Sequence, residues 1–518
     1  MSAITPSTNL KLLKNPNNLS SQNQLTFADA TAQYNYFNGL TKLEVEDFTY
    51  QRKDYVIRYS ACIDDILDYN YCMYQNEEYT NKWFYAYIVN MRYVNDNLTE
   101  ITIRTDVFQT YQFDLTYKSC YVEREHVNDD TVGLHTIDEG LGTGDYICNS
   151  LDTYLFNNIR FVIQVGGSKD NPVPNKATNV NGIIQPGSFY VCADYSDFVN
   201  AIQTVDNQIG WEVINAYMIP ADFLDYNLSG YWTGKDSPVT KTKTVTKQST
   251  LDGYTPVNHK CLVYPFQYLL ETNNNGGSNI LKYEMFTTSD MTFNIKGVST
   301  LGGSIVSIPT NYKEGNEVNM LVAGKFPTLA WSTDSYTNWL TQNGVNIPGH
   351  EMNAVQFNNT MAGLKIGAGV VAGLAGGIVT GGSLISSGFS DVLGTIASNY
   401  QAKQVPDTYH GNTNSGDYIT ASNTNGFYFY KMSVRSEIAR SIDSYFSMYG
   451  YKVNSVKVPN ITGRLNWNFV KCVGANIEAL IPEDYLNEIK NMFNSGITLW
   501  HNSSTFLDYS QSNAIVTP

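Results

Sequence analysis

Charged side chains are scarce in this chain of 518 residues. Asp, Glu, Lys and Arg make up 16% of it, against about a quarter in an average soluble domain. The balance is acidic, with 33 basic and 48 acidic residues and a net charge of −15. Nucleic-acid-binding proteins need a basic surface to displace phosphate counterions, so the composition argues against a protein that holds DNA or RNA. An acidic chain can still handle DNA if its role is not to retain it.

Paired cysteines and an amino-terminal leader are also lacking. The seven cysteines are scattered, with no CxxC pair. Neither a disulfide framework nor a zinc site is therefore expected, and buried or neutral thiols made in a reducing cytoplasm are the better interpretation. The first residues, MSAITPSTNLKLLKNPNN, have no apolar run after their few positive charges, so we expect no secretory signal.

Patterns of the common active sites are missing as well. No phosphate-binding loop and no GxSxG nucleophile motif occur, and His350 in HEMNA lacks the second histidine of a helical zinc site. EREH, Glu123 to His126, is more typical of a surface strand end than of a metal site. Adjacent carboxylates (Asp64-Asp65, Glu77-Glu78 and Asp129-Asp130) are typical of solvated surface on an acidic protein. We therefore expect that the protein is not an enzyme and that it binds neither a metal nor a cofactor.

The missing charge is replaced by Asn, Thr, Ser and 38 tyrosines, which together with Val, Ile and aromatics favour strands. Lys82 to Phe108 contains two such runs joined by Asn95-Asp96-Asn97, the pattern of a hairpin. A third run, Thr110 to Glu125, predicts an antiparallel meander. Turn formers are frequent from Asn128 to about Asn181, and the alternating Lys/Thr stretch from Thr240 to Thr250 predicts an exposed edge strand or arm.

Two helices are expected near the carboxyl end. Ser433 to Gly450 places Val434, Ile438, Ile442 and Phe446 about one helical turn apart, with Gly450 as the stop. Ile481 to Gly496 begins with Pro482 and acidic residues and then places Leu486, Ile489 and Phe493 on one face. The chain is therefore predicted to be α+β and predominantly β.

One long segment differs from the rest. Ile366 to Ser390 carries no charge, and eight of its 25 residues are glycine while nine are Ile, Val, Leu or Phe. The nine apolar side chains favour insertion into a bilayer by roughly 0.3–0.6 kcal/mol each, whereas each glycine in a helix costs roughly 1 kcal/mol relative to alanine. We call Ile366 to Ser390 the apolar segment, and we expect it to be a poor permanent anchor.

The glycines of the apolar segment are regularly spaced. Gly369, Gly373, Gly377 and Gly381 fall on every fourth position, which on a helix gives a smooth stripe for close helix contact. Several copies together are expected to insert better than one. The alternative is a buried helical hairpin or an apolar loop in a core, although a core normally takes larger side chains.

Short sequences at both ends of the chain resemble one family. They are QYNYFN (Gln33 to Asn38), YQNEEYTNKWFYAY (Tyr74 to Tyr87), TDVFQTYQFD (Thr105 to Asp114), VEREHV (Val122 to Val127), TIDEGL (Thr136 to Leu141), YGYKVNSVKVPN (Tyr449 to Asn460) and NSGITLWH (Asn494 to His501). In these seven short sequences the chain resembles the tail-knob, or distal tail-tube, proteins of small Picovirinae-type (Bacillus phage-like) podophages. The central part, about Leu151 to Val345, matches more loosely.

The resemblance implies a virion structural protein made in the host cytoplasm and placed at the distal end of the phage tail. Its partners are implied to be five further copies in a hexameric tube, the upstream tail or collar proteins, host cytoplasmic membrane lipids, and viral double-stranded DNA that passes without specific binding. A hydrophobic loop plugs the tube and leaves it at the membrane for genome ejection. The implied membrane-active residues are Leu364, Ile366, Gly367, Gly369, Val370, Val371, Gly373, Leu374, Gly377, Ile378, Val379, Gly381, Leu384, Ile385 and Phe389.

The same resemblance suggests five parts of the chain. Residues 1–150 form an amino-terminal tube part and residues 151–260 a variable knob insert. Residues 261–345 form a second β-rich tube part, residues 346–405 the membrane-active loop, and residues 406–518 an α/β part that completes the tube. A tail-tip cell-wall hydrolase or receptor-binding adhesin remains the alternative function, and a loop that only plugs the oligomer is a third.

Overall fold

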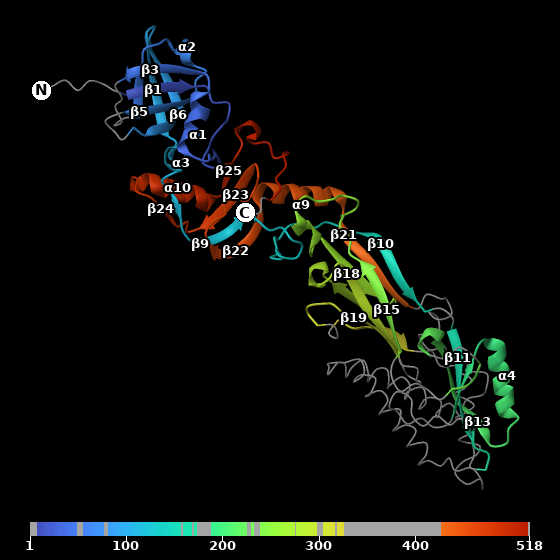
Figure 1. Ribbon diagram of the computed structural model, residues 1–518. Helices are drawn as coiled ribbons and strands as arrows, with labels where there is room; N and C mark the ends of the chain where they lie inside the picture. The colour runs from blue at the N-terminus through green and yellow to red at the C-terminus, as the bar shows by residue number, and fades with distance from the viewer. Residues whose placement is uncertain are drawn as a thin grey trace, which may run out of the picture. The chain divides into compact units, whose positions relative to one another are not determined.

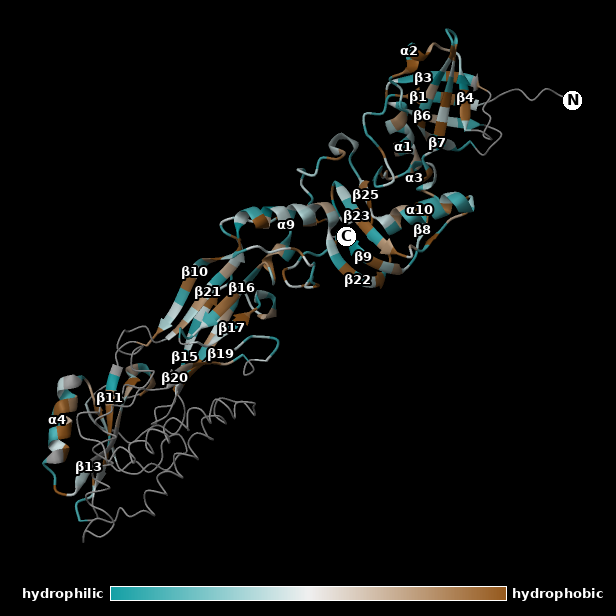
Figure 2. Ribbon diagram, turned by 180° about the vertical axis from the view of Figure 1, so that it is seen from behind, coloured by the Kyte–Doolittle hydropathy of each residue, from teal (hydrophilic) through white to brown (hydrophobic). Residues whose placement is uncertain are grey.

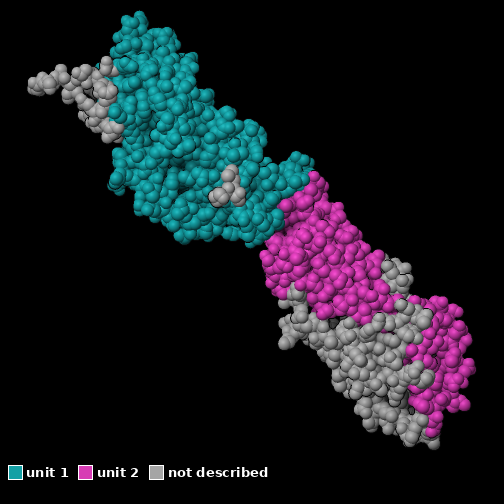
Figure 3. Space-filling model, in the orientation of Figure 1, with its two compact units in different colours: residues 1–142, 254–261, 436–518 teal, residues 143–253, 262–435 magenta. Residues whose placement is uncertain are grey.

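A computed structural model describes residues 8–48, 55–76, 81–156, 159–167, 170–173, 188–224, 229–232, 239–274, 276–297, 304–315, 319–325 and 426–515 (Figure 1). The chain divides into two compact units, coloured separately in Figure 3. Unit 1 comprises Met1–Gly142, Tyr254–Cys261 and Ser436–Pro518, and unit 2 comprises Thr143–Gly253 and Leu262–Arg435. The described part is rich in antiparallel strands with a few helices, which confirms the predicted α+β, predominantly β class.

Unit 1 begins with a six-stranded antiparallel sheet in the order β3-β1-β5-β6-β7-β4. Its strands are β1 (Thr8–Leu13), β3 (Lys42–Phe48), β4 (Val56–Tyr59), β5 (Tyr71–Asn76), β6 (Trp83–Asn95) and β7 (Leu98–Thr105). Strands β6 and β7 pair up to Asn95 and Leu98, which confirms the predicted hairpin. Helix α1 (Ala30–Asn38) lies in the connection between β1 and β3, and helix α2 (Ile63–Ile66) in the connection between β4 and β5.

The predicted third strand of the meander is wrong. Asp106 instead caps helix α3 (Val107–Tyr111), because its carboxylate accepts a hydrogen bond from the Gln109 N–H at 3.1 Å. The chain then passes through the short strand β8 (Thr116–Tyr117) into β9 (Cys120–Glu125), which joins a different sheet.

That second sheet combines the two ends of the chain. Its order is β2-β25-β23-β9-β22, so β9 lies between two strands from the carboxyl end. The strands are β2 (Asn23–Leu25), β25 (Ile497–Trp500), β23 (Trp467–Val473) and β22 (Tyr451–Lys457), and a further short pair joins β8 to β24 (Ile477–Glu478). Trp467 and Trp500 are fully buried and pack with side chains of the first sheet, so both sheets share one core.

Both predicted helices are present in unit 1. Helix α9 (Ser436–Tyr449) buries Ile442 and Phe446, and Gly450 follows it with a φ of +62°. Val434, expected on the helix, is the last residue of a strand instead. Helix α10 (Glu483–Ser495) buries Ile489 and Phe493, and Pro482 immediately precedes it at the N-cap position.

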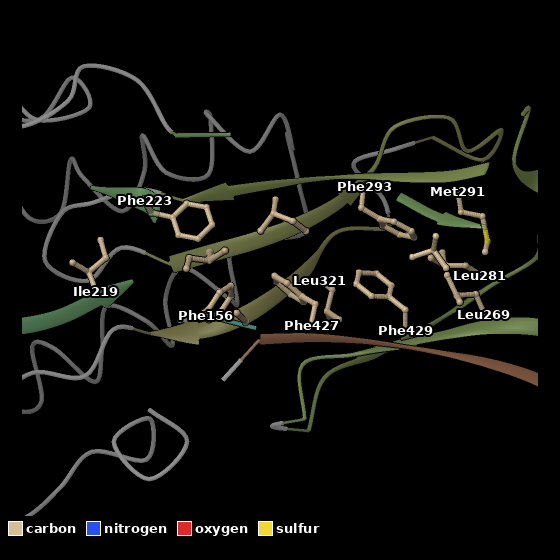
Figure 4. Packing of buried hydrophobic residues seen from close by; sticks show 14 of the residues in the cluster. Phe156, Ile219, Phe223, Leu269, Leu281, Met291, Phe293, Leu321, Phe427 and Phe429 are labelled. Atoms are coloured by element: carbon tan, nitrogen blue, oxygen red, sulfur yellow. The ribbon is translucent and has the colours of Figure 1, made fainter. Parts of the chain in front are cut away.

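Unit 2 contains a β-sandwich of two four-stranded sheets. One sheet has the order β10-β21-β16-β17 and the other β15-β18-β19-β20. The strands are β10 (Tyr146–Leu155), β21 (Gly426–Val434), β16 (Gln267–Thr272), β17 (Ser278–Leu281), β15 (Val239–Thr246), β18 (Asp290–Gly297), β19 (Ser304–Pro309) and β20 (Leu321–Lys325). Buried residues alternate with partly exposed ones along β18, and the buried side chains form the core in Figure 4. Figure 2 colours the strands by the hydropathy of their residues. Strand β15 is at a sheet edge, as the Lys/Thr alternation predicts.

A smaller sheet in the order β13-β11-β12-β14 completes unit 2. It contains β11 (Ile159–Gly167), β12 (Ser188–Cys192), β13 (Trp211–Pro220) and β14 (Gly230–Trp232), and α4 (Tyr195–Asp206) packs against it. One face, with Val162 and Tyr217, belongs to the core of the sandwich, and the other, with Ile163, packs with Phe198 of α4. Short 3-10 helices are η2 (Ala221–Phe223), η3 (His259–Leu262), η4 (Tyr283–Met285) and η7 (Ser503–Thr505).

Candidate functional site: the strands that flank the apolar segment

Strands β20 and β21 are the described strands nearest the apolar segment on either side. β20 ends at Lys325 and β21 begins at Gly426. Four of their side chains lie in the sandwich core and are at most 6% exposed: Leu321, Ala323, Phe427 and Phe429. Full burial of one Leu or Phe side chain contributes about 1.5–3 kcal/mol. Both strands are therefore held by substantial apolar burial.

Three aromatic rings join the two sheets at one end of the sandwich. The ring centroid of Phe156 lies 5.8 Å from that of Phe427 and 6.0 Å from that of Phe223, with an interplanar angle of 89° in both pairs (Figure 4). We call Phe156, Phe223 and Phe427 the aromatic base. Such edge-to-face pairs add about 0.5–1.5 kcal/mol beyond their burial. The ring of Phe223 also lies against Gly297, where a Cβ would come within 2.3 Å of its Cδ1 atom.

The strand register places both flanking residues at this end. Gly297 is the last residue of β18 and pairs with Ile305, which follows Ser304, the partner of Lys325. On the other sheet Gly426 pairs with Leu155, the residue before Phe156. The last residue of β20 and the first residue of β21 therefore lie at the same end of the sandwich, one on each sheet.

An ion cluster lies on one side of the sandwich. The Asp152 carboxylate of β10 is 3.1 Å from Lys431 Nζ of β21 and 3.4 Å from Lys243 Nζ of β15. Partial burial of the Asp152 carboxyl opposes its ionisation, but the two ammonium groups outweigh that effect and hold its pKa below the ordinary value. The cluster connects the edge strands of the two sheets.

Glu271 of β16 is a carboxyl group enclosed in the sandwich core. It is 0% exposed, and alternation along β16 points it inward together with Leu269. Neither carboxylate oxygen makes a hydrogen bond of good geometry with a described residue. Burial raises the pKa of Glu271 to about 8, although the nearby side chains of Ser307 and Asn279 favour the charged form. Glu271 is therefore largely neutral at pH 7.

The residues expected to act at a membrane lie outside the described part of the chain, and so does the whole of residues 346–405. The residues concerned are Leu364, Ile366, Gly367, Gly369, Val370, Val371, Gly373, Leu374, Gly377, Ile378, Val379, Gly381, Leu384, Ile385 and Phe389. Among the residues that are described, no helix is long and apolar enough to cross a bilayer.

The interpretation of EREH as a surface strand end is wrong in one respect. The sequence does end strand β9, but Glu125 and His126 are both 0% exposed. His126 Nδ1 accepts a hydrogen bond from the Phe469 N–H at 2.7 Å, so the imidazole ring is bonded to the backbone of β23. Burial holds the pKa of His126 well below its usual range, and neighbouring Arg464 acts in the same direction. Within the described ranges, no three His, Cys, Asp or Glu side chains are grouped as a metal site requires.

The aromatic base and Glu271 were not predicted from the sequence. Phe156 follows a strand and Phe223 lies in a 3-10 helix, far from Phe427 in the sequence, and no periodic pattern connects them. A Glu that alternates with Gln267 and Leu269 on an inward face is the one available signal for Glu271, and it requires the strand to be located first.

Comparison with known proteins gives a consistent result. Residues 233–514 match the family described as Bacillus phage phi29, Tail knob protein gp9, C-terminal domain, and residues 6–116 match the Caudoviral major tail protein N-terminus. Tail knob protein gp9 of Bacillus phage phi29 is 25% identical to this chain, with 98% of each chain covered. The gp9 protein of Bacillus phage B103 is 24% identical, over 94% of this chain and 95% of that protein.

A solved structure shows the same fold. The tail knob protein gp12 of bacteriophage C1 superposes with a TM-score of 0.66 at 16% identity, over 98% of this chain and 100% of that one. The matching relatives are named as parts of a tail and not as enzymes. Because the phi29 gp9 family match covers more than half of the chain, the chain belongs to the tail knob protein family, whose members are structural components of the virion at the phage tail.

Proposed function

We propose that this tail knob protein forms a hexameric, DNA-conducting tube at the distal end of the tail, together with other tail proteins of the virion. The apolar segments of the six copies plug the lumen before infection. On host contact they leave the tube and penetrate the cytoplasmic membrane, so that the genome can pass. In this proposal the protein acts as a conduit and not as an enzyme.

The attachment of the flanking strands is the observation that carries the proposal. Lys325 and Gly426 end and begin strands at one end of a single sandwich, next to the aromatic base. Residues 326–425 can then change position while both of their ends stay fixed in a packed core. A segment that must be held in one state and released in another needs such an attachment.

The composition supports the remaining steps. One apolar segment inserts weakly because its glycines offset its apolar residues, but six copies attached to one tube raise their effective concentration. The stripe from Gly369 to Gly381 permits close contact between the inserted copies. A net charge of −15 suits a duct in which phosphate slides without binding.

The five parts of the chain take these roles in the proposal. Residues 1–150, 261–345 and 406–518 form the tube, residues 151–260 form the knob insert, and residues 346–405 form the membrane-active loop.

Replacing the apolar segment tests this function. Ile366 to Ser390 is exchanged for a Gly/Ser linker of equal length, so that the spacing between β20 and β21 is kept. The variant should assemble to the same mass by light scattering but release no dye from liposomes. Retention of wild-type dye release would contradict the proposed role of the apolar segment. A Gly/Ser exchange of the exposed turn Asp96-Asn97 serves as the control and should release dye normally.

A further inference from the structure

The two sheets of the sandwich in unit 2 have very different outer faces. Along β15 and β18 the buried residues alternate with polar ones, which therefore point away from the core. These outward residues are Thr240, Thr242, Thr244 and Thr246 on β15 and Asp290, Thr292, Asn294 and Lys296 on β18. Such a face is typical of a sheet that is in contact with water.

The outer face of the other sheet carries a row of apolar side chains that crosses all four strands. The register pairs Leu151 of β10 with Tyr430 of β21, Tyr430 with Leu270 of β16, and Leu270 with Ile280 of β17. We call these four residues the outward row. Their neighbours along three of the strands lie in the sandwich core, so the outward row points away from it: Phe429, Leu269 and Leu281. Leu151 is 46% exposed and Ile280 54%.

The positions on both sides of the outward row are uncharged as well. They are Cys148, Met432 and Tyr268 on one side and Thr153, Tyr428, Thr272 and Ser278 on the other. Charged residues are depleted in the core of protein–protein interfaces, where Tyr and Met are enriched. An apolar patch of this kind on a soluble protein marks a surface that binds a partner. The contrast with the threonine-rich face of the same sandwich supports this assignment.

The charge of the chain favours a second copy as the partner. Each copy has a net charge of −15, so two copies repel each other in general. A face without carboxylates is a place where they can approach with little repulsion. A polysaccharide fits less well, because its hydroxyl groups need polar partners and the side chains of Leu151, Leu270 and Ile280 offer none.

We propose that the outward row is the centre of a contact with a second copy of this chain, an inference that rests on the hexamer of the proposed function. A ring of six copies joined by one kind of contact is head-to-tail, so the neighbouring copy presents a different surface to the row. Every contact in the ring then contains one outward row. A chain whose row cannot be used should therefore remain a monomer.

Light scattering of the full chain tests this contact. Ile280→Glu and Leu151→Glu each place a carboxylate at an exposed end of the outward row, on β17 and β10 respectively. Burial of an unpaired charge in the contact is strongly unfavourable, so the molar mass of both variants should fall to about one sixth of the wild-type value. Ser289→Glu adds the same charge in an exposed turn and should assemble as wild type does. Circular dichroism should show the same strand content in all four proteins.

The outcomes separate this inference from the proposed function. If both row variants are folded and keep the wild-type mass, the contact is refuted while the hexamer stands. If wild type is itself a monomer, the proposed hexamer fails and the contact fails with it. Binding to purified bacterial cell walls is measured in parallel. Row variants that assemble normally but lose this binding would assign the row to a polysaccharide and overturn the inference.

Discussion

Single buried polar residues hold parts of unit 1 together that are far apart in the sequence. Asp443 of α9 is 2% exposed. Its carboxylate accepts hydrogen bonds from the Tyr254 hydroxyl at 2.7 Å, the Val257 N–H at 2.8 Å and the Asn258 N–H at 2.9 Å. One side chain thus attaches residues 254–261 to unit 1.

Asp443→Ala should weaken unit 1 markedly, because it leaves two buried donors of Asn258, its N–H and its Nδ2, and the part-buried Tyr254 hydroxyl without their acceptor. Each unsatisfied buried donor costs about 1–3 kcal/mol, so we expect the free energy of unfolding to fall by roughly 3 kcal/mol. Hydrogen exchange of the β22 and β23 amides measures this for unit 1 alone. Asp65→Ala, at an exposed carboxylate, should change it by less than about 0.5 kcal/mol. Equal protection in the two variants would refute this account of Asp443.

The environment of single residues was the property least predictable from sequence. EREH looks like a surface strand end, yet Arg124 donates to the Gly450 carbonyl at 2.6 Å, 326 positions away. His126 is buried for the same reason, since β9 lies between β22 and β23. The residues next to them in the sequence do not indicate such distant neighbours. The burial of these polar residues therefore could not be predicted without the structure.

At the scale of elements, local signals were reliable where the structure depends on near neighbours. The β6–β7 hairpin, α9, α10 and the β15 edge strand all follow from turn residues, periodicity or alternation within one segment. The errors have local causes too. Asp106 stops a strand by capping α3, and the turn formers between Asn128 and Asn181 concealed β10 and β11, whose partners lie elsewhere in the chain.

The contact between Gly297 and Phe223 offers a test of how the sandwich end is built. Gly297→Ala should destabilise unit 2 by about 1–3 kcal/mol, because the new Cβ overlaps the ring of Phe223, which is fully buried. Phe223→Ala should cost about 3–5 kcal/mol through the cavity it leaves. The two changes should be less than additive by at least 0.5 kcal/mol, since the smaller side chain makes room for the new methyl group.

Chemical denaturation of the single and double variants measures this coupling. Gly142→Ala, where an added Cβ meets nothing within 4 Å, serves as the matched control. Strict additivity of the two changes would mean that the ring moves aside freely and that the close approach has no energetic weight.

At the scale of the whole molecule, the family and the α+β class could be predicted from the sequence. The family could be predicted because short sequences that resemble it occur in order at both ends of the chain. The division into units could not, because unit 1 is assembled from three separate stretches of sequence. The aromatic base depends on the same long-range arrangement.

The proposed assembly predicts a specific role for the glycine stripe. Replacing Gly369, Gly373, Gly377 and Gly381 with Leu removes the glycine cost and adds apolar surface, so each chain should bind liposomes at least tenfold more tightly. The bulky stripe should also prevent close helix contact, so dye release should fall despite the tighter binding. Flotation of the protein with liposomes and dye release measure the two effects separately. If release rises together with binding, close packing of the stripe has no part in the channel.

The position of β9 between β22 and β23 also sets an order of events during synthesis. When Glu125 leaves the ribosome, neither neighbouring strand exists, and at 5–20 residues per second they follow on the order of tens of seconds later. All of the described strands of unit 2 emerge in that interval, so the sandwich can close while β9 still has both edges open. A nascent chain that stops early exposes those edges to aggregation, and only a completed chain can hide them.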